Sequence, residues 1–467
     1  MSARRAWPSE RASLVLLALA VRLAVVLVAE PEPVWDGRYF DAFARRLARG
    51  EGYVVPVEGH GEALRATAHY PVGYPVALAL AYRLLGDHVG VAFLLQCALG
   101  AALVAVIHEI AGSVSGPRAA RAAGLVTALH PGLVLGAPLV MAEPLAALLY
   151  AALVACMLHV PAHLGAAALG GLVAGFATLV RPQTLLLAPA LLAVALGSAS
   201  TSIPRRRSLA AVLLVVGTLT AAVAPWSLRN ARVLDGPALV STNGGWNLAI
   251  GALPGATGRY RALPADHGCE AVGGEVAVDR CLGAKARDTI ARDPLAFLAL
   301  VPAKLSYAID YEAFPVEALH EAHPERMPEA LRRTAWRVLM ALHQVLLLAC
   351  AAAVLRGRSP SVRIAAALVA LAPMVALGRP TSGGVALALG ALLLTERALV
   401  DRLVGAALLV FLGTHAVFFG EDRYHTVIEA LFALPLATRL FAHAPRRGAR
   451  ATETTPPPVE REATASK

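Results

Sequence analysis

Charged side chains are scarce in this chain of 467 residues. Only 16% of the residues are Asp, Glu, Lys or Arg, whereas 57% are hydrophobic and the mean hydropathy is +0.61. A soluble protein of this length needs far more polar surface to cover its core. The apolar residues also form runs of roughly 17–24 residues, which is the length of a membrane-spanning helix. The composition therefore excludes a soluble globular protein and predicts an all-α polytopic membrane protein.

Cysteine is scarce as well. Five cysteines in 467 residues exclude a disulfide scaffold. Cys97, Cys156 and Cys350 lie in apolar runs and are interpreted as small core residues. Cys269 and Cys281 share a long polar loop, and they pair if that loop faces an oxidising compartment. The sequence leaves both states of this pair open.

Several chemical motifs are absent. The chain has no P-loop, no zinc-type His/Cys spacing and no GxSxG motif. The net charge of +10 on its own would suggest nucleic acid. Basic residues between membrane helices, however, mark the cytoplasmic side of a membrane protein. We therefore expect the lipid bilayer as a partner and no nucleic acid.

Apolar runs divide the chain into twelve predicted spans. The basic residues between them are asymmetric: with the N-terminus inside, the cytoplasmic segments hold sixteen arginines, and the short outer connections hold only Arg181, Arg379 and Arg423. The first run is interpreted as a retained helix rather than a signal peptide, and Arg22 within it as facing other helices. The spans are 13–29, 88–111, 120–137, 143–160, 165–180, 184–197, 209–225, 334–355, 363–378, 382–396, 403–419 and 426–441.

Two long outer loops remain, at about 30–87 and 226–333. Each contains an apolar stretch, 70–86 in the first and 293–310 in the second, and we interpret both as helices at the outer membrane face. The polar, Pro/Thr-rich tail 442–467 is predicted to be a disordered cytoplasmic segment.

The first outer loop opens with an amphipathic pattern. Phe40, Phe43, Ala44 and Leu47 recur at helical spacing, and Asp36 precedes them. This pattern predicts an interfacial helix that begins near Asp36. Two roles for that acid remain open, a helix N-cap and the centre of an active site.

Polar groups gather at the outer ends of the predicted helices. Acids there could deprotonate a hydroxyl or amine or hold a metal, and cations could neutralise a phosphate leaving group. Each group also has a structural alternative, such as a first-turn acid that favours the helix dipole, an interfacial arginine or a solvated turn. The residues are Asp36, Glu143, Arg181, Arg229, Arg423 and His425.

Several stretches resemble the protein O-mannosyltransferase-like family of GT-C glycosyltransferases, which includes the bacterial aminoarabinose transferase. They are "WDGRYFDAFARRLARGEGY", "HYPVGYPVALAL", "ALHPGLVLGAPLVMAEPLAALL", "GLVAGFATLVRPQTLLLAP", "APWSLRNARVL…STNGGWNLAIGALPGATG" and "EDRYHTV", and the resemblance runs from about residue 13 to 440 in the same order. It implies a GT-C type bundle of about 11–13 transmembrane helices over residues 1–441, with two long extracytoplasmic loops that carry interfacial helices.

The resemblance also implies a reaction. Members look like inverting glycosyltransferases, here a hexosyl- or pentosyltransferase, that use a polyprenyl-phosphate sugar donor outside the cytoplasmic membrane. By motif position, Asp36 matches the catalytic base and Glu143 the acid of the second outer turn, which either orients the acceptor or helps to bind a divalent cation. Arg181 and the "RY" pair, Arg423 and Tyr424, match residues near the donor phosphate.

His425 follows that pair and is predicted to contact the same phosphate. Two features depart from the family pattern. Tyr70 stands where the aminoarabinose enzyme has a lysine, and the first loop reads "DG" where many relatives read "DE". No cofactor other than such a cation is implied, and the acceptor is a lipid, a glycan or a protein.

Two other functions fit the charge set alone. A membrane transporter or lipid-linked-sugar flippase would be expected to show inverted repeats and polar groups at mid-membrane. No internal repeat is evident, and the candidate residues gather at one face. A non-catalytic protein of polysaccharide assembly is the third alternative, and the paired outer acids favour it less.

Overall fold

The structure is a computed structural model that describes residues 3–57, 63–199 and 203–441. The predicted tail, 442–467, lies outside the described residues. Within them the chain is predominantly helical, with a single two-stranded antiparallel pair, β1 (Val54–Pro56) and β2 (Leu64–Ala66), in the first long loop. The predicted all-α class is confirmed.

Helices coincide with all twelve predicted spans. Six of them, α1, α4, α10, α16, α17 and α19, are long and apolar enough to cross a membrane by length and composition. The elements are α1 (Ala3–Ala29), α4 (Val89–Ser115), α5 (Pro117–Leu129), α7 (Glu143–His159), α8 (Leu164–Val180), α9 (Thr184–Ser198), α10 (Arg205–Val233), α16 (Glu329–Leu355), α17 (Pro360–Leu377), α18 (Gly383–Leu394), α19 (Leu399–Val417), and finally α20 (Thr426–Glu429), η1 (Ala430–Phe432) and α21 (Ala433–Phe441).

The helices depart from the predicted spans at several places. The run 120–137 breaks after α5, and a short helix, α6 (Pro131–Leu135), follows. Pro131 lacks an N–H and forces His130 out of the helical region, with ψ 120°. Helix α10 continues to Val233, past the predicted end at 225, although Pro225 lies inside it.

The long loops are built from further helices. The first contains α2 (Asp36–Arg49) and α3 (Gly73–Leu85), and the second contains α11 (Gly244–Ala252), α12 (Glu275–Arg292), α13 (Pro294–Ala299), α14 (Val301–Ile309) and α15 (Phe314–Ala322). A disulfide joins Cys269 to Cys281 and lies in a small core between α11 and α12. The stretch 293–310 forms two helices, and the second, α14, packs against α18 and α19 with Lys304 buried.

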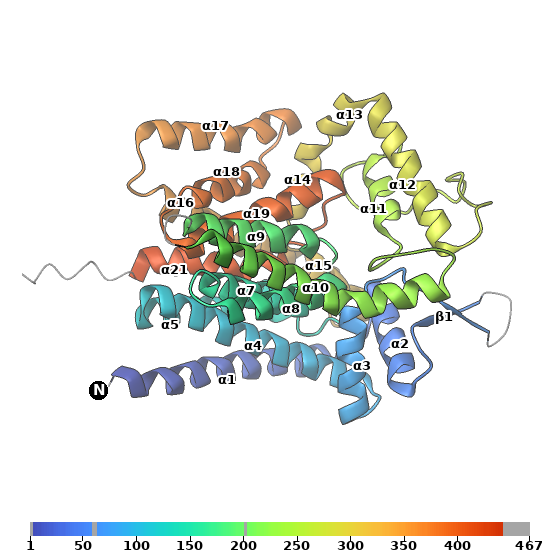
Figure 1. Ribbon diagram of the computed structural model, residues 1–467, viewed down its shortest axis with the longest axis horizontal. Coiled ribbons are helices and arrows are strands. Elements are labelled where there is room, and N and C mark those ends of the chain that lie inside the picture. The colour runs from blue at the N-terminus through green and yellow to red at the C-terminus, as the bar shows by residue number, and fades with distance from the viewer. Residues whose placement is uncertain (1–2, 58–62, 200–202, 442–467) are drawn as a thin grey trace, which may run out of the picture.

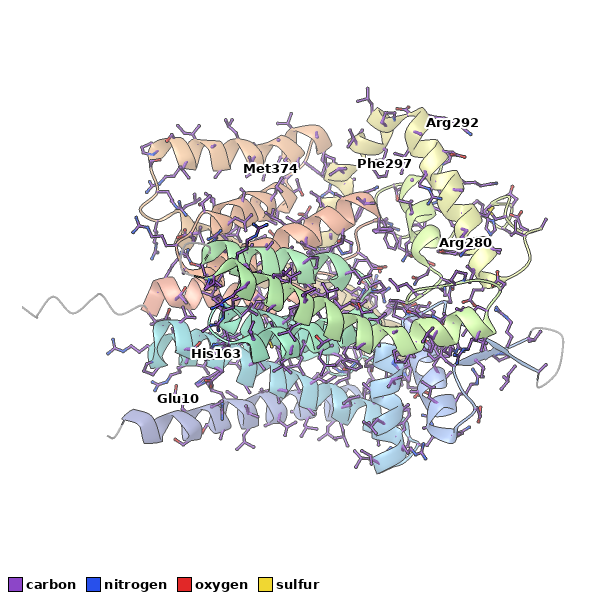
Figure 2. All side chains as sticks on the ribbon, in the orientation of Figure 1. Glu10, His163, Arg280, Arg292, Phe297 and Met374 are labelled. Atoms are coloured by element: carbon purple, nitrogen blue, oxygen red, sulfur yellow. A yellow bond between two sulfur atoms is a disulfide. The ribbon has the colours of Figure 1, made fainter. Side chains whose placement is uncertain are left out.

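Both loops lie at one end of the helical bundle. In Figure 1, α2, α3, α11 and α12 gather at the right, whereas the start of α1 and the end of α21 lie at the left. Figure 2 shows the same separation in side chains, with Arg280 and Arg292 of α12 far from Glu10 and His163. We call the right-hand end the loop end. The arrangement agrees with the topology that arginine asymmetry predicts, in which both loops share one side.

Glycines allow α8 and α10 to pack closely. A Cβ atom added to Gly171 would lie 2.7 Å from the Cα atom of Val215, and one added to Gly175 would lie 2.9 Å from the backbone oxygen of Leu219. Small residues four apart let two helix backbones approach in this way. This contact therefore depends on the absence of side chains at two positions of α8.

Gly171→Val is expected to destabilise the fold by about 1–3 kcal/mol, because the new side chain must displace the backbone of α10. The measurement is thermal unfolding of the purified protein in detergent. Gly165→Val is the control on the same helix, since a Cβ atom there meets no described atom within 4 Å. Equal unfolding temperatures for the two variants would contradict the close packing of α8 on α10.

Candidate active site

Asp36 is the first residue of α2, and its side chain does not cap that helix. The N-cap position belongs to Trp35, which has a φ of 47° and makes no side-chain cap hydrogen bond. The Asp36 carboxylate instead contacts distant parts of the chain. Its Oδ2 lies 2.7 Å from Nη1 of Arg423, and its Oδ1 accepts a hydrogen bond of 2.9 Å from the hydroxyl of Tyr70. The N-cap interpretation is therefore wrong.

These contacts set the protonation of Asp36. Burial alone would raise the pKa of its carboxyl group, but the charge of Arg423 and the hydrogen bonds from Arg423 and Tyr70 hold that pKa below its ordinary value. Burial and the neighbouring carboxylate raise the pKa of Tyr70, so its hydroxyl remains a donor. Asp36 is consequently ionised at neutral pH, as a general base has to be.

Arg423 joins the acids to one another. Its Nε lies 2.9 Å from Oε2 of Glu421 and 3.8 Å from Oε1 of Glu143, while Nη1 pairs with Asp36. Burial disfavours its charge, but the carboxylates of Glu421 and Asp36 raise its pKa well above the ordinary value. The guanidinium group of Arg423 therefore contacts three carboxylates. It lies between Asp36 and Glu143, in the place where a metal ion shared by these two acids would bind.

Arg181 forms the second positive group of the site. It follows the last residue of α8 and pairs with Glu143, which opens α7 with Pro144 behind it. The ring of Tyr424 contacts both guanidinium groups, with the carbon of Arg181 5.1 Å and that of Arg423 5.2 Å from the ring centroid. The Nε of Arg181 makes no hydrogen bond within the described residues. A donor is thus left for a ligand.

Of the six residues predicted for catalysis or phosphate binding, five, Asp36, Glu143, Arg181, Arg423 and Tyr424, meet at the loop end. Arg229, which the sequence placed in the same polar set, instead donates to the backbone oxygens of Thr67 and Tyr53. The sixth, His425, is turned elsewhere: its Nδ1 lies 3.1 Å from the backbone oxygen of Ala308 and its ring 4.4 Å from that of His343. Its predicted contact with a donor phosphate stays a prediction. Tyr70 and Glu421 are part of the site and were not among the predicted residues. The proline after Tyr70 and the acids beside Arg423 were the available signals.

An apolar groove adjoins these charges. It extends from Glu143 and Arg423 to Arg22. Its walls are mostly apolar, and include Leu133, Leu139, Met141 and Phe314. Arg22 is fully buried and donates to the backbone oxygens of Ala18 and Ala128, so it faces other helices, as predicted.

Tyr70→Phe is expected to raise the pKa of Asp36, because the lost hydrogen bond favours the ionised carboxylate. Hydrogen bonds to charged groups contribute roughly 1.5–3 kcal/mol, so the acid limb of the activity profile should move up by about one to two pH units. The check is catalytic rate against pH. Tyr39→Phe is the control, since Tyr39 stacks on Tyr70 without a hydrogen bond to Asp36 among the described contacts. If the acid limb of Tyr70→Phe lay at the same pH as that of the wild type, the hydrogen bond from Tyr70 would not control the pKa of Asp36.

Fold and site together define a polytopic membrane protein with a paired set of acids and arginines at one end of its helical bundle. Residues 69–226 match the family model of dolichyl-phosphate-mannose-protein mannosyltransferases. The match covers a third of the chain and contains Glu143 and Arg181, but neither Asp36 nor Arg423. It supports the resemblance to GT-C glycosyltransferases that the sequence motifs predict.

Three solved structures are similar to this chain, each with a TM-score below 0.5. The oligosaccharyltransferase AglB of Archaeoglobus fulgidus, in complex with an inhibitory peptide and a dolichol-phosphate, has a TM-score of 0.47 at 12% identity over 92% of this chain, which spans 50% of that chain. ArnT of Cupriavidus metallidurans bound to undecaprenyl phosphate has a TM-score of 0.38 at 16% identity, and the match covers 91% of this chain and 77% of that chain. The apo form of the same protein has a TM-score of 0.37 at 16% identity, and the match covers 92% of this chain and 78% of that chain. No curated protein matches the chain in sequence.

Proposed function

We propose that the protein is an inverting glycosyltransferase that moves a sugar from a polyprenyl-phosphate donor to an acceptor hydroxyl or amine. The observation that carries the proposal is the ionised Asp36, paired with Arg423 beside the Glu143–Arg181 pair, at the charged end of an apolar groove. The family match over residues 69–226 supports a lipid-phosphate donor. The loop end would face the outside of the cytoplasmic membrane, in agreement with the arginine asymmetry.

The donor is proposed to bind with its lipid chain along the groove and its phosphate against Arg181 and Arg423. Both guanidinium groups already contact carboxylates, so the phosphate has to compete with Glu143 for Arg181 and with Asp36 for Arg423. Arg181 keeps one N–H that makes no hydrogen bond in the described part of the chain. Arginine suits this role because its planar group can bind two oxygens of a phosphate at once.

Donor binding would then activate the base. Arg423 is the main cause of the low pKa of Asp36 apart from burial, which acts in the opposite direction. When the guanidinium group of Arg423 also binds the phosphate, it stabilises the Asp36 carboxylate less. The pKa of Asp36 then rises, and the carboxylate becomes a stronger base. We infer that a bound donor and a basic Asp36 are coupled through this single guanidinium group.

The reaction is a single displacement. Asp36 accepts the proton of the acceptor hydroxyl or amine as that group attacks the anomeric carbon from the side opposite the phosphate. A bond forms from the acceptor atom to the anomeric carbon, and the bond to the phosphate oxygen breaks, so the electron pair leaves with the polyprenyl phosphate. Arg181 and Arg423 stabilise the departing negative charge. Attack from the opposite side inverts the anomeric centre.

The experiment is a transfer assay in membranes that contain the protein, with a panel of radiolabelled polyprenyl-phosphate sugars. With the wild type, the expected result is that the label leaves the lipid fraction and joins a protein, glycan or lipid acceptor. The rate of this transfer should be at least about 100-fold lower with Asp36→Asn, and it should also be lower with Glu143→Gln. A flippase would move labelled lipid between leaflets without separating sugar from lipid. Labelled lipid that stays intact with every donor contradicts the proposal.

A further inference from the structure

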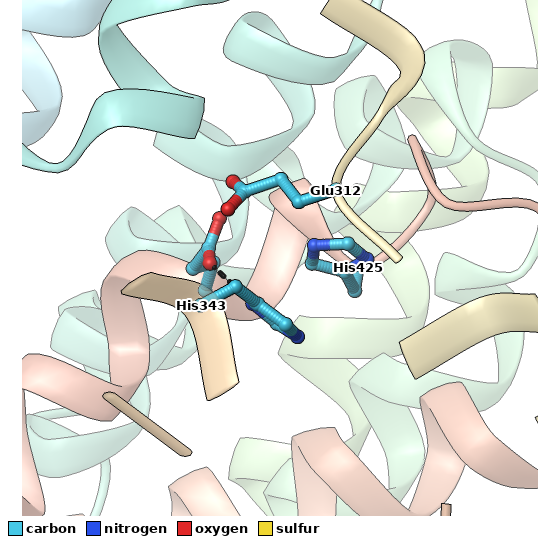
Figure 3. Close-up of side chains that lie close together, drawn as sticks. Glu312, His343 and His425 are labelled. Atoms are coloured by element: carbon cyan, nitrogen blue, oxygen red, sulfur yellow. Dashed lines mark hydrogen bonds and ion pairs between the residues drawn. The ribbon is translucent and has the colours of Figure 1, made fainter. Parts of the chain in front are cut away.

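A second cluster of titratable side chains lies behind the turn that carries Arg423. Glu312, His343, His425 and Glu429 are all buried, and one ligand atom from each lies within 4.8 Å of the others. Figure 3 shows the side chains of Glu312, His343 and His425 turned toward one another from three separate segments. Buried ionisable groups inside a membrane protein are costly, and they mark a functional site by default.

The members come from elements far apart in the sequence. Glu312 lies in the connection between α14 and α15, and His343 lies on α16. His425 immediately precedes α20, and Glu429 ends it. Only the tertiary fold therefore brings these four side chains together.

Each histidine turns one ring nitrogen toward the cluster, and that of His343 is in contact with Glu429. Nε2 of His343 lies 2.8 Å from the backbone oxygen of Ile309, and Nδ1 of His425 lies 3.1 Å from that of Ala308. A carbonyl oxygen only accepts, so these two nitrogens carry hydrogen. The other nitrogen of each ring, Nδ1 of His343 and Nε2 of His425, is left as an acceptor in the neutral tautomer. Metal-binding histidines are oriented by such outer hydrogen bonds.

Three of the four carboxylate oxygens in the cluster lack a hydrogen bond among the described residues, and the fourth, Oε1 of Glu429, contacts His343. Neither oxygen of Glu312, nor Oε2 of Glu429, nor Nε2 of His425 has a hydrogen-bond partner among the described residues. Oε1 of Glu429 lies 2.8 Å from Nδ1 of His343. The backbone is also shaped around Glu312, because a Cβ atom added to Gly132 would overlap its carboxylate. Two buried carboxylates held this closely cannot both stay ionised unless a cation lies between them, and otherwise they share a proton.

We propose that Glu312, His343, His425 and Glu429 bind one divalent transition cation of the Zn²⁺ class. Two neutral imidazoles and two carboxylates form a mixed nitrogen and oxygen ligand set, and a charge of +2 balances the two carboxylates. This set favours Zn²⁺, Mn²⁺ or Fe²⁺ over Ca²⁺ and Mg²⁺, which prefer oxygen ligands throughout. His130 lies beside the set, with Nε2 3.2 Å from Oε1 of Glu429.

The bound cation would hold the turn that positions Arg423. His425 lies two residues after Arg423, and the residue after Glu312, Ala313, donates its backbone N–H to Asp422 at 2.8 Å. A cation on His425 and Glu312 therefore ties this turn to α16. The site is separate from the acids at Asp36 and Glu143, and its binding can be measured without any sugar donor. A failure of this proposal is thus distinguishable from a failure of the proposed transferase activity.

The test uses the purified full chain, treated with a chelator and then dialysed against ZnCl₂ alone, with metal content measured by elemental analysis. We expect about one equivalent of Zn²⁺ in the wild type and at least roughly tenfold weaker binding in Glu312→Gln and His425→Gln, since metal affinity is sensitive at this level to the groups around a site. His415→Gln is the matched control. Its ring is buried and its Nδ1 lies 2.8 Å from the backbone oxygen of Phe419, but it is not a member of the cluster.

A second measurement is the unfolding temperature with and without Zn²⁺. It should rise with Zn²⁺ in the wild type and in His415→Gln but not in Glu312→Gln. No bound Zn²⁺ in the wild type would overturn the proposal and leave a cluster that shares protons instead, and this result does not depend on whether the variants fold. Equal binding in all variants would also overturn it. Equal occupancy by Mg²⁺ would overturn the assignment to a transition metal.

Discussion

Asp36→Asn is expected to lower the rate of sugar transfer by roughly 10²–10⁴-fold, the usual contribution of a well-placed general base. An amide has the shape of the carboxylate but cannot take the acceptor's proton. Its oxygen can still accept the hydrogen bond from Tyr70, and no helix cap is lost, because the N-cap position belongs to Trp35. The measurement is the initial rate with a radiolabelled polyprenyl-phosphate sugar, at equal amounts of monodisperse protein.

The matched control for this variant is Asp41→Asn on the same helix. The Asp41 carboxylate accepts from Arg45 at 2.8 Å and from the hydroxyl of Tyr82, and none of its described contacts reaches Arg423. Asp41→Asn should therefore keep transfer close to that of the wild type. If Asp36→Asn retained full activity, the carboxylate would be a structural partner of Arg423 and a different base would have to be sought.

Arg423→Gln is expected to have an effect of similar size on activity, at least about 100-fold, because the variant lacks the charge that stabilises the leaving phosphate. It also leaves the carboxylates of Asp36, Glu143 and Glu421 without their shared guanidinium. Removal of one partner from a largely buried ion pair typically costs about 3–5 kcal/mol of stability. Both transfer and the unfolding temperature should fall.

The pH dependence of this variant has a definite sign. In the wild type the pKa of Asp36 is depressed, so the carboxylate stabilises the fold above the ordinary pKa of aspartate, and that contribution is lost as the pH falls through the lower folded pKa. Without Arg423 the pKa of Asp36 rises. The acid limb of the residual activity should therefore move to higher pH, as measured by rate against pH.

Arg439→Gln is the control for the loss of a guanidinium as such. Arg439 pairs with Asp401 at 3.0 Å and is exposed to nearly the same extent, 18% against 16% for Arg423. Its variant should lose stability and keep the acid limb of the wild type. A shift of that limb in both variants would mean that destabilisation, rather than the charge of Arg423, sets the pH profile.

Local patterns predicted most of the helices and failed at particular residues. Runs of apolar residues locate the spans because a helix in lipid has to satisfy its own backbone hydrogen bonds. Pro131 ended a predicted span early, since its ring restricts the residue before it to a non-helical conformation, whereas Pro225 lies inside α10 without ending it. The same residue type therefore had opposite outcomes in two helices.

The residues of the candidate site were also predictable only in part from the local sequence. Motif positions predicted Asp36, Glu143, Arg181, Arg423 and Tyr424, and the structure brings these five together. Nothing in the local sequence indicated that Tyr70 would donate to Asp36 across 34 residues, or that Glu421 would share Arg423 with two other acids. Hydrogen bonds between distant segments leave no periodic pattern.

The sequence by itself determined the class of the protein. Its hydropathy required a bundle of membrane helices, its arginines assigned both long loops to one side, and its acids and bases at helix ends indicated chemistry there. These properties depend on composition and on contacts within a few residues, so they can be read along the chain. The tertiary structure alone decided the partners of each charge. Tyr424 lies on two arginines while the next residue, His425, joins Glu312, His343 and Glu429, because adjacent residues in a tight turn point to opposite sides and each side meets helices from elsewhere in the chain.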